Sequence, residues 1–205
     1  MNSLIGIQIF YSILSDIIMS KIGQLKVYYG CMFSGKTSAL IEYLSHSGLK
    51  PNEFIVIKPD VDIRYSKNSI VTHDGKSHEC LIYHSEFDVF EHVTPFTKLL
   101  VIDEAQFINK VFMGDVKRLL AKGIDVVAAG LDTDYLLRPF GLMAGLVEVA
   151  NEKNQLKAKC SSCGGDAVYT YRKTENKVLI LVGQSEHYEA RCSNCHPLAN
   201  KVSVV

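Results

Sequence analysis

A glycine-rich segment at residues 30–37 constrains the fold of this 205-residue chain more than any other feature. It reads Gly-Cys-Met-Phe-Ser-Gly-Lys-Thr, follows an apolar run at Leu25–Tyr29 and precedes helical spacing over residues 36–47. Glycines in such a turn let successive backbone N–H groups face one anion, and the following helix points its positive dipole end at the same place. The pattern therefore predicts a strand, a phosphate-binding P-loop and a helix, with Lys36 reaching the β- and γ-phosphates of a nucleotide.

A second apolar run, at residues 99–102, ends in Asp103 and Glu104. In a parallel sheet that carries a P-loop, a strand of this kind delivers a carboxylate to the same edge. We expect Asp103 to organise Mg²⁺ together with the hydroxyl of Thr37. We expect Glu104 to act as a general base that takes a proton from an acceptor hydroxyl. Two solvated acids that only end a strand are the alternative.

Apolar runs alternate with helical patterns along most of the chain. Further runs at residues 54–57 and 124–129 lie on either side of an amphipathic stretch at residues 109–122. Strands that alternate with helices predict an α/β fold, a parallel sheet with helices on both faces. Residues 58–76 are mostly polar, and we expect them to be mainly loop.

Two C-x-x-C pairs give the end of the chain a different character. Cys160 with Cys163 and Cys192 with Cys195 have the spacing of two knuckles that complete a tetrahedral Cys₄ zinc site. Disulfides or free thiols are the alternatives, and a reducing compartment disfavours the first. We expect the metal to anchor the loop between the pairs, and not the P-loop.

The ends of the chain and the cysteine pairs suggest four segments. The first twenty residues are mostly apolar, but Asp16 lies inside the run, no basic segment precedes it, and Met19 offers a second start. We therefore expect a tail outside the fold and neither a signal peptide nor a membrane anchor. The expected segments are an N-terminal tail at 1–20, a P-loop ATP-binding domain at 21–155, a zinc domain at 156–197 and a C-terminal tail at 198–205.

Composition limits the partners. The hydrophobic fraction of 47% is ordinary for a soluble globular protein. Lys plus Arg and Asp plus Glu number 22 each, so no large net field attracts nucleic acid or an anionic membrane. We expect a cytoplasmic protein that binds neither.

Further short segments accompany these motifs: Asp62-x-Arg64-Tyr65, Asp103-Glu104-Ala105-Gln106-Phe107, Gly130-Leu131-Asp132 and Arg138-Pro139-Phe140. Together with the P-loop and the four cysteines, over about residues 24–197, they resemble the zinc-containing (type II, cellular-type) thymidine kinase family. The resemblance implies a RecA-like P-loop sheet, a small C-terminal zinc-binding domain whose lasso loop closes over thymidine, and a homotetramer. It implies transfer of the ATP γ-phosphoryl group to the 5′-hydroxyl of thymidine, and of deoxyuridine, in nucleotide salvage.

The resemblance also implies roles for individual residues. Glu104 would deprotonate the 5′-hydroxyl, with Lys36 and Asp103 as further catalytic residues. The implied ATP contacts are Gly30, Cys31, Met32, Phe33, Ser34, Gly35, Lys36, Thr37, Asp62, Ile63, Arg64, Asp103, Glu104, Ala105 and Gln106. The implied substrate contacts are Tyr135, Leu179, Ile180, Leu181, Val182, Gly183 and Tyr188.

Two positions depart from the family pattern, and two other functions compete. Cys31 stands where the family usually has proline, and Val182-Gly183 stands where a pair of glycines is common.

A nucleic-acid-dependent ATPase is one rival function, because the segment from Val101 to Gln106 also resembles a helicase motif. It would need two RecA-like domains and a basic track. A non-catalytic zinc module that binds ATP as a regulator is the other rival, and it would have no use for Glu104.

Overall fold

A six-stranded parallel sheet forms the centre of the computed structural model, which describes residues 22–61, 68–71, 75–174 and 185–199. The strand order is β5-β2-β6-β7-β1-β8, and each strand runs parallel to its neighbours. The six strands are β1 (Leu25–Tyr29), β2 (Phe54–Pro59), β5 (Leu81–Tyr83), β6 (Leu99–Ile102), β7 (Asp125–Gly130) and β8 (Glu152–Gln155). The expected α/β class is confirmed.

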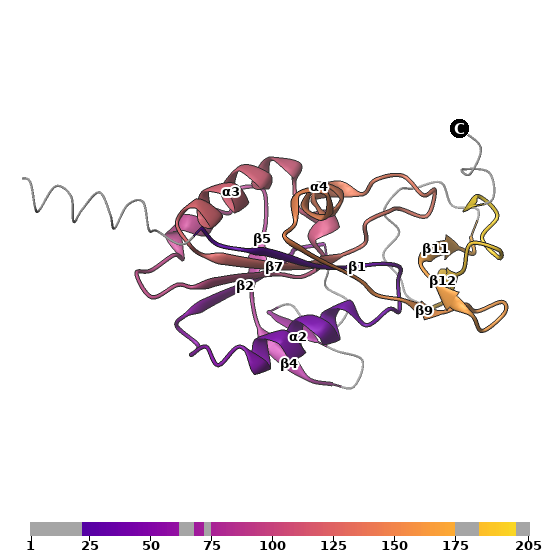
Figure 1. Cartoon of the computed structure of the whole chain (residues 1–205), viewed down its shortest axis with the longest axis horizontal. Helices are drawn as coiled ribbons and strands as arrows, with labels where there is room; N and C mark the ends of the chain where they lie inside the picture. The colour runs from indigo at the N-terminus through magenta and orange to yellow at the C-terminus, as the bar shows by residue number, and fades with distance from the viewer. Residues whose placement is uncertain (1–21, 62–67, 72–74, 175–184, 200–205) are drawn as a thin grey trace, which may run out of the picture.

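Helices cover both faces of the sheet (Figure 1). They are α2 (Lys36–His46) on one face, and α3 (Met113–Ala121) and α4 (Gly141–Val149) on the other. Alternate side chains of β6 point to opposite faces: Val101 packs in the cluster of α2, whereas Leu100 and Ile102 pack in the cluster of α3 and α4. Burial on both faces explains why the middle strands are continuously apolar in sequence.

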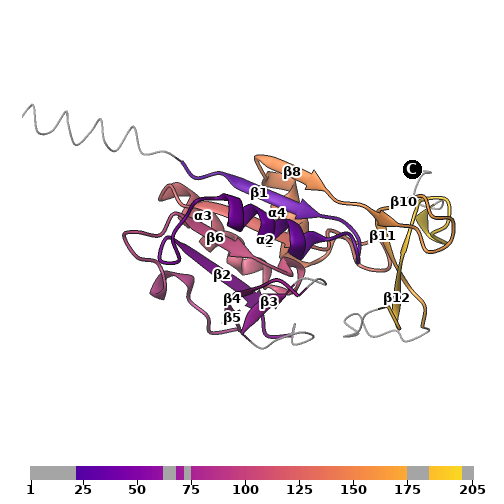
Figure 2. The ribbon, with the colours of Figure 1, turned by 90° about the horizontal axis from the view of Figure 1, so that it is seen from below.

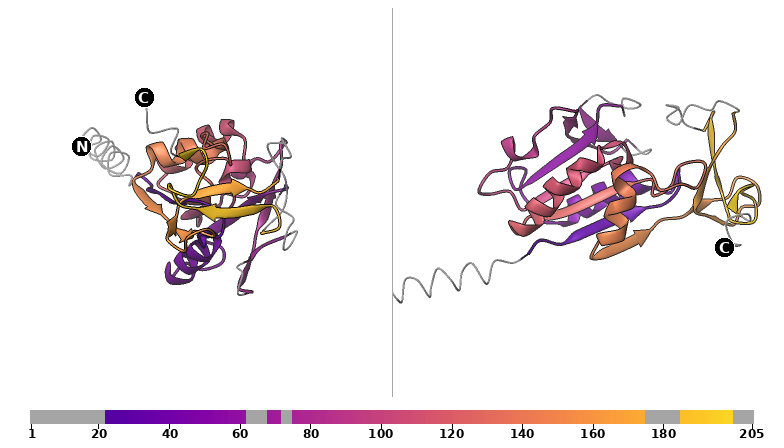
Figure 3. Two further views of the ribbon diagram at one scale, coloured as in Figure 1. Left: turned by 90° about the vertical axis from the view of Figure 1, so that its right-hand side faces the viewer. Right: turned by 90° about the horizontal axis from the view of Figure 1, so that it is seen from above.

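The cysteine-rich end of the chain lies beyond the carboxyl ends of the central strands (Figures 2 and 3). It contains two antiparallel pairs, β9 (Ala158–Lys159) with β10 (Asp166–Ala167), and β11 (Tyr169–Arg172) with β12 (Tyr188–Arg191). The boundary expected near residue 155 stays a prediction. Within the residues that the structure describes, none of the helices has the length and apolar character needed to span a lipid bilayer.

Short elements complete the fold. The antiparallel hairpin β3 (Ser69–Val71) and β4 (Ser77–Glu79) gives the described part of residues 58–76 a strand that the polar pattern did not predict. The amphipathic stretch begins with a 3₁₀ turn at Lys110–Phe112 and continues as α3. Two more 3₁₀ turns lie at Val89–Glu91 and Ala105–Phe107.

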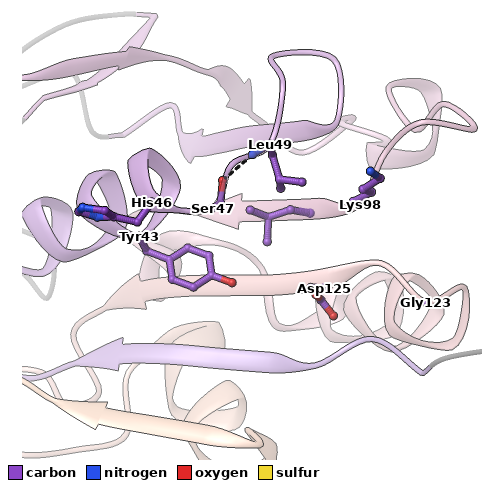
Figure 4. Close-up of a pocket in the computed structure, with 8 residues that line it drawn as sticks. Tyr43, His46, Ser47, Leu49, Lys98, Gly123 and Asp125 are labelled. Atoms are coloured by element: carbon purple, nitrogen blue, oxygen red, sulfur yellow. Dashed lines mark hydrogen bonds between the residues drawn. The ribbon is translucent and has the colours of Figure 1, made fainter.

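A cavity of about 490 Å³ lies at the amino-terminal edge of the sheet, where β6 and β7 begin (Figure 4). Its lining residues are Tyr43, His46, Ser47, Leu49, Lys98, Leu99, Gly123 and Asp125. None of these is an expected site residue. The P-loop, which follows β1, lies at the opposite edge.

Candidate active site and metal centre

The P-loop backbone has the conformations that its glycines permit. Gly30 has φ 137°, and a Cβ there would lie 2.2 Å from the carbonyl oxygen of Leu156. Gly35 has φ 81° and is the residue from which α2 starts. The helix N-terminus therefore opens directly onto the loop, as an anion-binding turn requires.

Lys36 is buried inside this loop. Its Nζ donates hydrogen bonds to the Cys31 carbonyl oxygen at 2.7 Å and to Ser34 Oγ at 3.4 Å. Burial lowers the pKa of Lys36, and the nearby carboxylate of Glu104, followed by that of Asp103, opposes part of this shift. The charge of Lys36 thus lies beside the two acids that follow β6.

Thr37 and Asp103 bring their oxygens together at the carboxyl end of β6. Thr37 Oγ1 donates to Asp103 Oδ2 at 3.0 Å and is 3.3 Å from Asp103 Oδ1. Asp103 is buried, and its Oδ1 also accepts a hydrogen bond from the backbone N–H of Glu104. A hydroxyl and a carboxylate next to a phosphate-binding loop are the oxygen ligands that Mg²⁺ takes. The donor set fits this metal.

Glu104 and Gln106 lie in the turn after Asp103. Glu104 adopts a left-handed backbone conformation with φ 49°, and Ala105 begins the 3₁₀ turn. The Gln106 side chain donates from Nε2 to Glu104 Oε2 and accepts at Oε1 from the backbone N–H of Leu131, at 2.9 Å. Both polar ends of Gln106 are therefore engaged within the protein.

Asp132 is a polar residue of this edge to which the sequence assigned no role. Burial raises the pKa of its carboxyl, while hydrogen bonds from backbone N–H groups and the charge of Lys36 oppose that rise. The sequence does contain a pattern that could have identified Asp132. This residue comes just after the apolar strand β7, much as Asp103 comes just after β6.

The four cysteines of the two pairs converge. Their Sγ atoms all lie within 4.8 Å of one another, and those of Cys163 and Cys192 are 3.7 Å apart. Four Zn–S bonds of about 2.3 Å in a tetrahedron require sulfur atoms about 3.8 Å apart. The arrangement therefore fits a tetrahedral zinc ion held by Cys160, Cys163, Cys192 and Cys195.

Backbone groups prepare this cluster for a metal. Although burial raises the pKa of Cys160, hydrogen bonds from the backbone N–H groups of Cys192, Ser162 and Cys163 lower it to about 6. Each pair closes on itself, since Gly164 N donates to Cys160 O at 2.8 Å and His196 N donates to Cys192 O at 3.0 Å. The thiolate of Cys160 is therefore stabilised, whereas the thiols of Cys192 and Cys163 raise the pKa of Cys195 to about 12. The thiolate is the form that binds zinc.

The cysteine-rich region also packs against the P-loop. Cys31 Sγ donates to the Ala167 carbonyl oxygen at 3.4 Å, and the backbone N–H of Met32 donates to Thr170 Oγ1 at 3.0 Å. Cys31 shares a buried cluster with Cys160 and Ala167. The sequence predicts that the metal anchors the intervening loop and not the P-loop, and this packing leads us to expect that the metal supports the phosphate-binding turn as well.

Arg172 brings together two expected substrate residues, Tyr135 and Tyr188. Its guanidinium carbon lies 3.7 Å from the centre of the Tyr135 ring, and its Nη2 donates to Tyr188 Oη at 2.7 Å. Nearby in sequence to Tyr135, Phe140 meets Phe107 edge to face at 5.6 Å. Sequence reasoning did not single out Arg172, because its two partners come from other parts of the chain.

Some of the expected contacts with ATP and with the substrate lie outside the described residues. They are Asp62, Ile63, Arg64, Leu179, Ile180, Leu181, Val182 and Gly183. Their roles stay predictions.

Two comparisons relate the chain to known proteins. Among solved structures, a Pif1 helicase from Candida albicans is similar over 71% of this chain and 38% of that chain, with 14% sequence identity and a TM-score of 0.37. This chain thus spans about 38% of that helicase's length. A family model described as thymidine kinase matches residues 23–196, which is most of the sequence. The chain belongs to the thymidine kinase family, a family of ATP-dependent phosphotransferases.

Proposed function

We propose that this protein is a thymidine kinase, which transfers the γ-phosphoryl group of ATP to the 5′-hydroxyl of thymidine, and of deoxyuridine, in nucleotide salvage. One observation carries the proposal. The carboxylate of Glu104 is near enough to the P-loop Lys36 to oppose the lowering of that lysine's pKa, and Glu104 directly follows Asp103, which bonds Thr37. A base next to a P-loop can take the proton of an acceptor hydroxyl, whereas a site that only binds a nucleotide needs no base.

In the proposed reaction, ATP lies along the P-loop from Gly30 to Thr37 and near Asp62, Ile63, Arg64 and Ala105. Glu104 takes the proton of the 5′-hydroxyl as the O5′–Pγ bond forms. The bond between Pγ and the β,γ-bridging oxygen breaks, and ADP leaves with that electron pair. Lys36 stabilises the charge on the phosphate oxygens. Mg²⁺ held by Thr37 and Asp103 would neutralise further charge on the β- and γ-phosphates.

The nucleoside would lie between the P-loop edge and the cysteine-rich region. Tyr135 and Tyr188, joined through Arg172, offer flat surfaces for a neutral base. Residues 179–183 are proposed to add backbone contacts to the base. Zinc held by the four cysteines would be structural, since no open ligand position is needed for phosphoryl transfer.

The resemblance further supports a homotetramer, and the balanced charge supports a cytoplasmic protein that binds neither nucleic acid nor a membrane. These properties are proposals, and two of them have a direct measurement. Sedimentation of the purified full chain gives the oligomeric state. Titration with a labelled DNA strand tests the absence of nucleic-acid binding.

A nucleoside panel with ATP and Mg²⁺ tests the proposed function. We expect ADP release that depends on thymidine and formation of thymidine 5′-monophosphate. Glu104→Gln should lower kcat by about 10²–10⁴ with ATP affinity little changed, because a general base is lost and the phosphate site is kept. Glu148→Gln, in an exposed turn of α4, is a matched control that should leave kcat unchanged.

Two results would contradict the proposal. ATP hydrolysis that DNA stimulates and thymidine does not affect would support the ATPase rival. Tight ATP binding with no turnover on any nucleoside, and no effect of Glu104→Gln, would support a regulatory module.

A further inference from the structure

We propose that Gln106 is a positioning residue that fixes the carboxylate of Glu104 for proton transfer, and that it does not contact ATP. This inference rests on the proposed function, in which Glu104 is the base. It replaces the ATP contact that the family resemblance implies for Gln106.

The orientation of the Gln106 side chain follows from its partners. The backbone N–H of Leu131 can only donate, so the atom that it meets at 2.9 Å must be the amide oxygen of Gln106. The amide nitrogen then faces Glu104 and donates to Oε2. A flipped amide would set N–H against N–H at Leu131 and oxygen against carboxylate at Glu104. The hydrogen-bond network permits one orientation.

Gln106 is buried and closely packed on both its side chain and its backbone. Gln106 is 3% exposed. A Cβ added at Gly130 would lie 2.4 Å from Gln106 Oε1, and a Cβ at Gly141 would lie 1.8 Å from the Gln106 carbonyl oxygen. Two glycines from separate segments therefore make room for the Gln106 side chain and backbone. Such close packing fixes a rotamer.

The consequence for Glu104 is that one oxygen of its carboxylate is held in place. Its backbone already turns sharply at φ 49°, and the amide of Gln106 holds Oε2 from the next turn of chain. An amide donor gives no proton to the carboxylate, so the group stays a base. Leu131, at the carboxyl end of β7, thereby sets the position of a base that follows β6, through one buried side chain.

Kinetics of Gln106 variants test this role. Gln106→Glu keeps an acceptor for Leu131 but replaces the donor to Glu104 with a like charge. Gln106→Met keeps a side chain of similar length and removes the hydrogen bonds to both Glu104 and Leu131. For each we expect kcat to fall by about 10–10², with KM for ATP changed less than about threefold, because the base is misplaced while the phosphate site is kept. Gln24→Glu makes the same chemical change at the opposite edge of the sheet, and it should leave both kcat and the KM for ATP unchanged.

A double-mutant cycle separates positioning from a structural role. If Gln106 acts through Glu104, then adding Gln106→Met to Glu104→Gln should lower kcat less than about threefold further. An equal loss in both backgrounds would overturn the inference. So would a raised KM for ATP with kcat unchanged, which would restore the ATP contact.

A measurement without turnover keeps this inference distinct from the proposed function. The side-chain amide protons of Gln106 in ¹⁵N-labelled full-length protein should exchange slowly with solvent, and faster in Glu104→Ala. Rapid exchange in the unsubstituted protein would overturn the inference. If that protein fails to phosphorylate thymidine, the proposed function is wrong, and the amide exchange alone then decides whether Gln106 holds Glu104.

Discussion

Glu104 shows how the site uses an unfavourable backbone conformation. A non-glycine residue with φ 49° costs on the order of 1–3 kcal/mol and persists only where its surroundings hold it. Here Glu104 N donates to Asp103 Oδ1, and Phe107 N donates to the Glu104 carbonyl oxygen, both at 3.0 Å. The turn therefore directs two consecutive acids to different tasks, since Asp103 bonds Thr37 while Glu104 bonds Gln106.

Asp132 gives a prediction on stability against pH. Burial raises its pKa above the ordinary value of 3.8. The charged form of Asp132 therefore lowers the stability of the folded protein, and the full effect is present once the pH exceeds the raised pKa. Asp132→Asn keeps an acceptor for the backbone N–H groups and removes that charge. We expect the unfolding temperature at pH 7 to rise by on the order of 2–4 °C, the effect of about 1 kcal/mol in a chain of this size.

The pH profile checks the sign of this effect. As the pH falls through the raised pKa and below 3.8, Asp132 becomes protonated in both states, and the gain from Asp132→Asn should vanish. Asp166→Asn is the matched control. The pKa of Asp166 is lowered by its bond to Lys157, so that variant should bring no gain at pH 7. A gain from Asp132→Asn that stays constant from pH 3 to pH 8 would contradict the role of burial.

At the scale of elements, the sequence predicts the parts that carry phosphate chemistry. The strand β1, the P-loop and α2 follow from a glycine turn between an apolar run and helical spacing. The middle strands β6 and β7 follow from continuous apolar runs, because both faces of a parallel sheet are buried. The convergence of the four cysteines follows from pair spacing alone.

Other elements could not be predicted from the local sequence pattern, for physical reasons. The helix α4 reads Gly-Leu-Met-Ala-Gly-Leu-Val-Glu-Val, with one charge in nine residues, so it shows no polar face that would mark a helix. The strand β8 is an exposed edge strand of Glu, Lys, Asn and Gln, and lacks the apolar residues that mark a strand. The contacts of Gln106 with Leu131 and of Arg172 with Tyr135 depend on tertiary packing, which no local pattern contains.

Thr170 of β11 gives a prediction at this scale, because it joins two elements. Its hydroxyl accepts from the Met32 backbone N–H of the P-loop, and the residue is buried. Thr170→Val keeps the shape but leaves that N–H without its acceptor, at a cost of about 1–3 kcal/mol. We expect a loosened P-loop and an ATP dissociation constant raised by on the order of tenfold, measured by calorimetry.

Thr170→Ser is the control, because it keeps the hydroxyl and loses only a methyl group. Its ATP affinity should stay within about threefold of the unsubstituted protein. If serine and valine weaken ATP binding equally, the methyl group and not the hydrogen bond to Met32 is responsible.

At the scale of the whole molecule, the P-loop lies between two differently built regions. The parallel sheet supplies Asp103 and Glu104 from one side, and the cysteine-rich region supplies Ala167 and Thr170 from the other. Because Cys160 packs in the same buried cluster as Cys31, the four-cysteine cluster is continuous with the P-loop. Metal binding should therefore affect both substrates.

Loss of the metal tests this continuity. Cys163→Ser should abolish the zinc content, lower the unfolding temperature and weaken binding of both thymidine and ATP, because metal binding contributes directly to folding of such regions. Cys80→Ser changes a cysteine outside the two pairs, packed against the cluster of α2, and should alter none of these properties. Calorimetry with thymidine and with ATP, together with zinc measured by atomic absorption, makes the comparison. ATP affinity that stays within twofold after zinc loss would show that the contacts of Ala167 and Thr170 with the P-loop form without the metal.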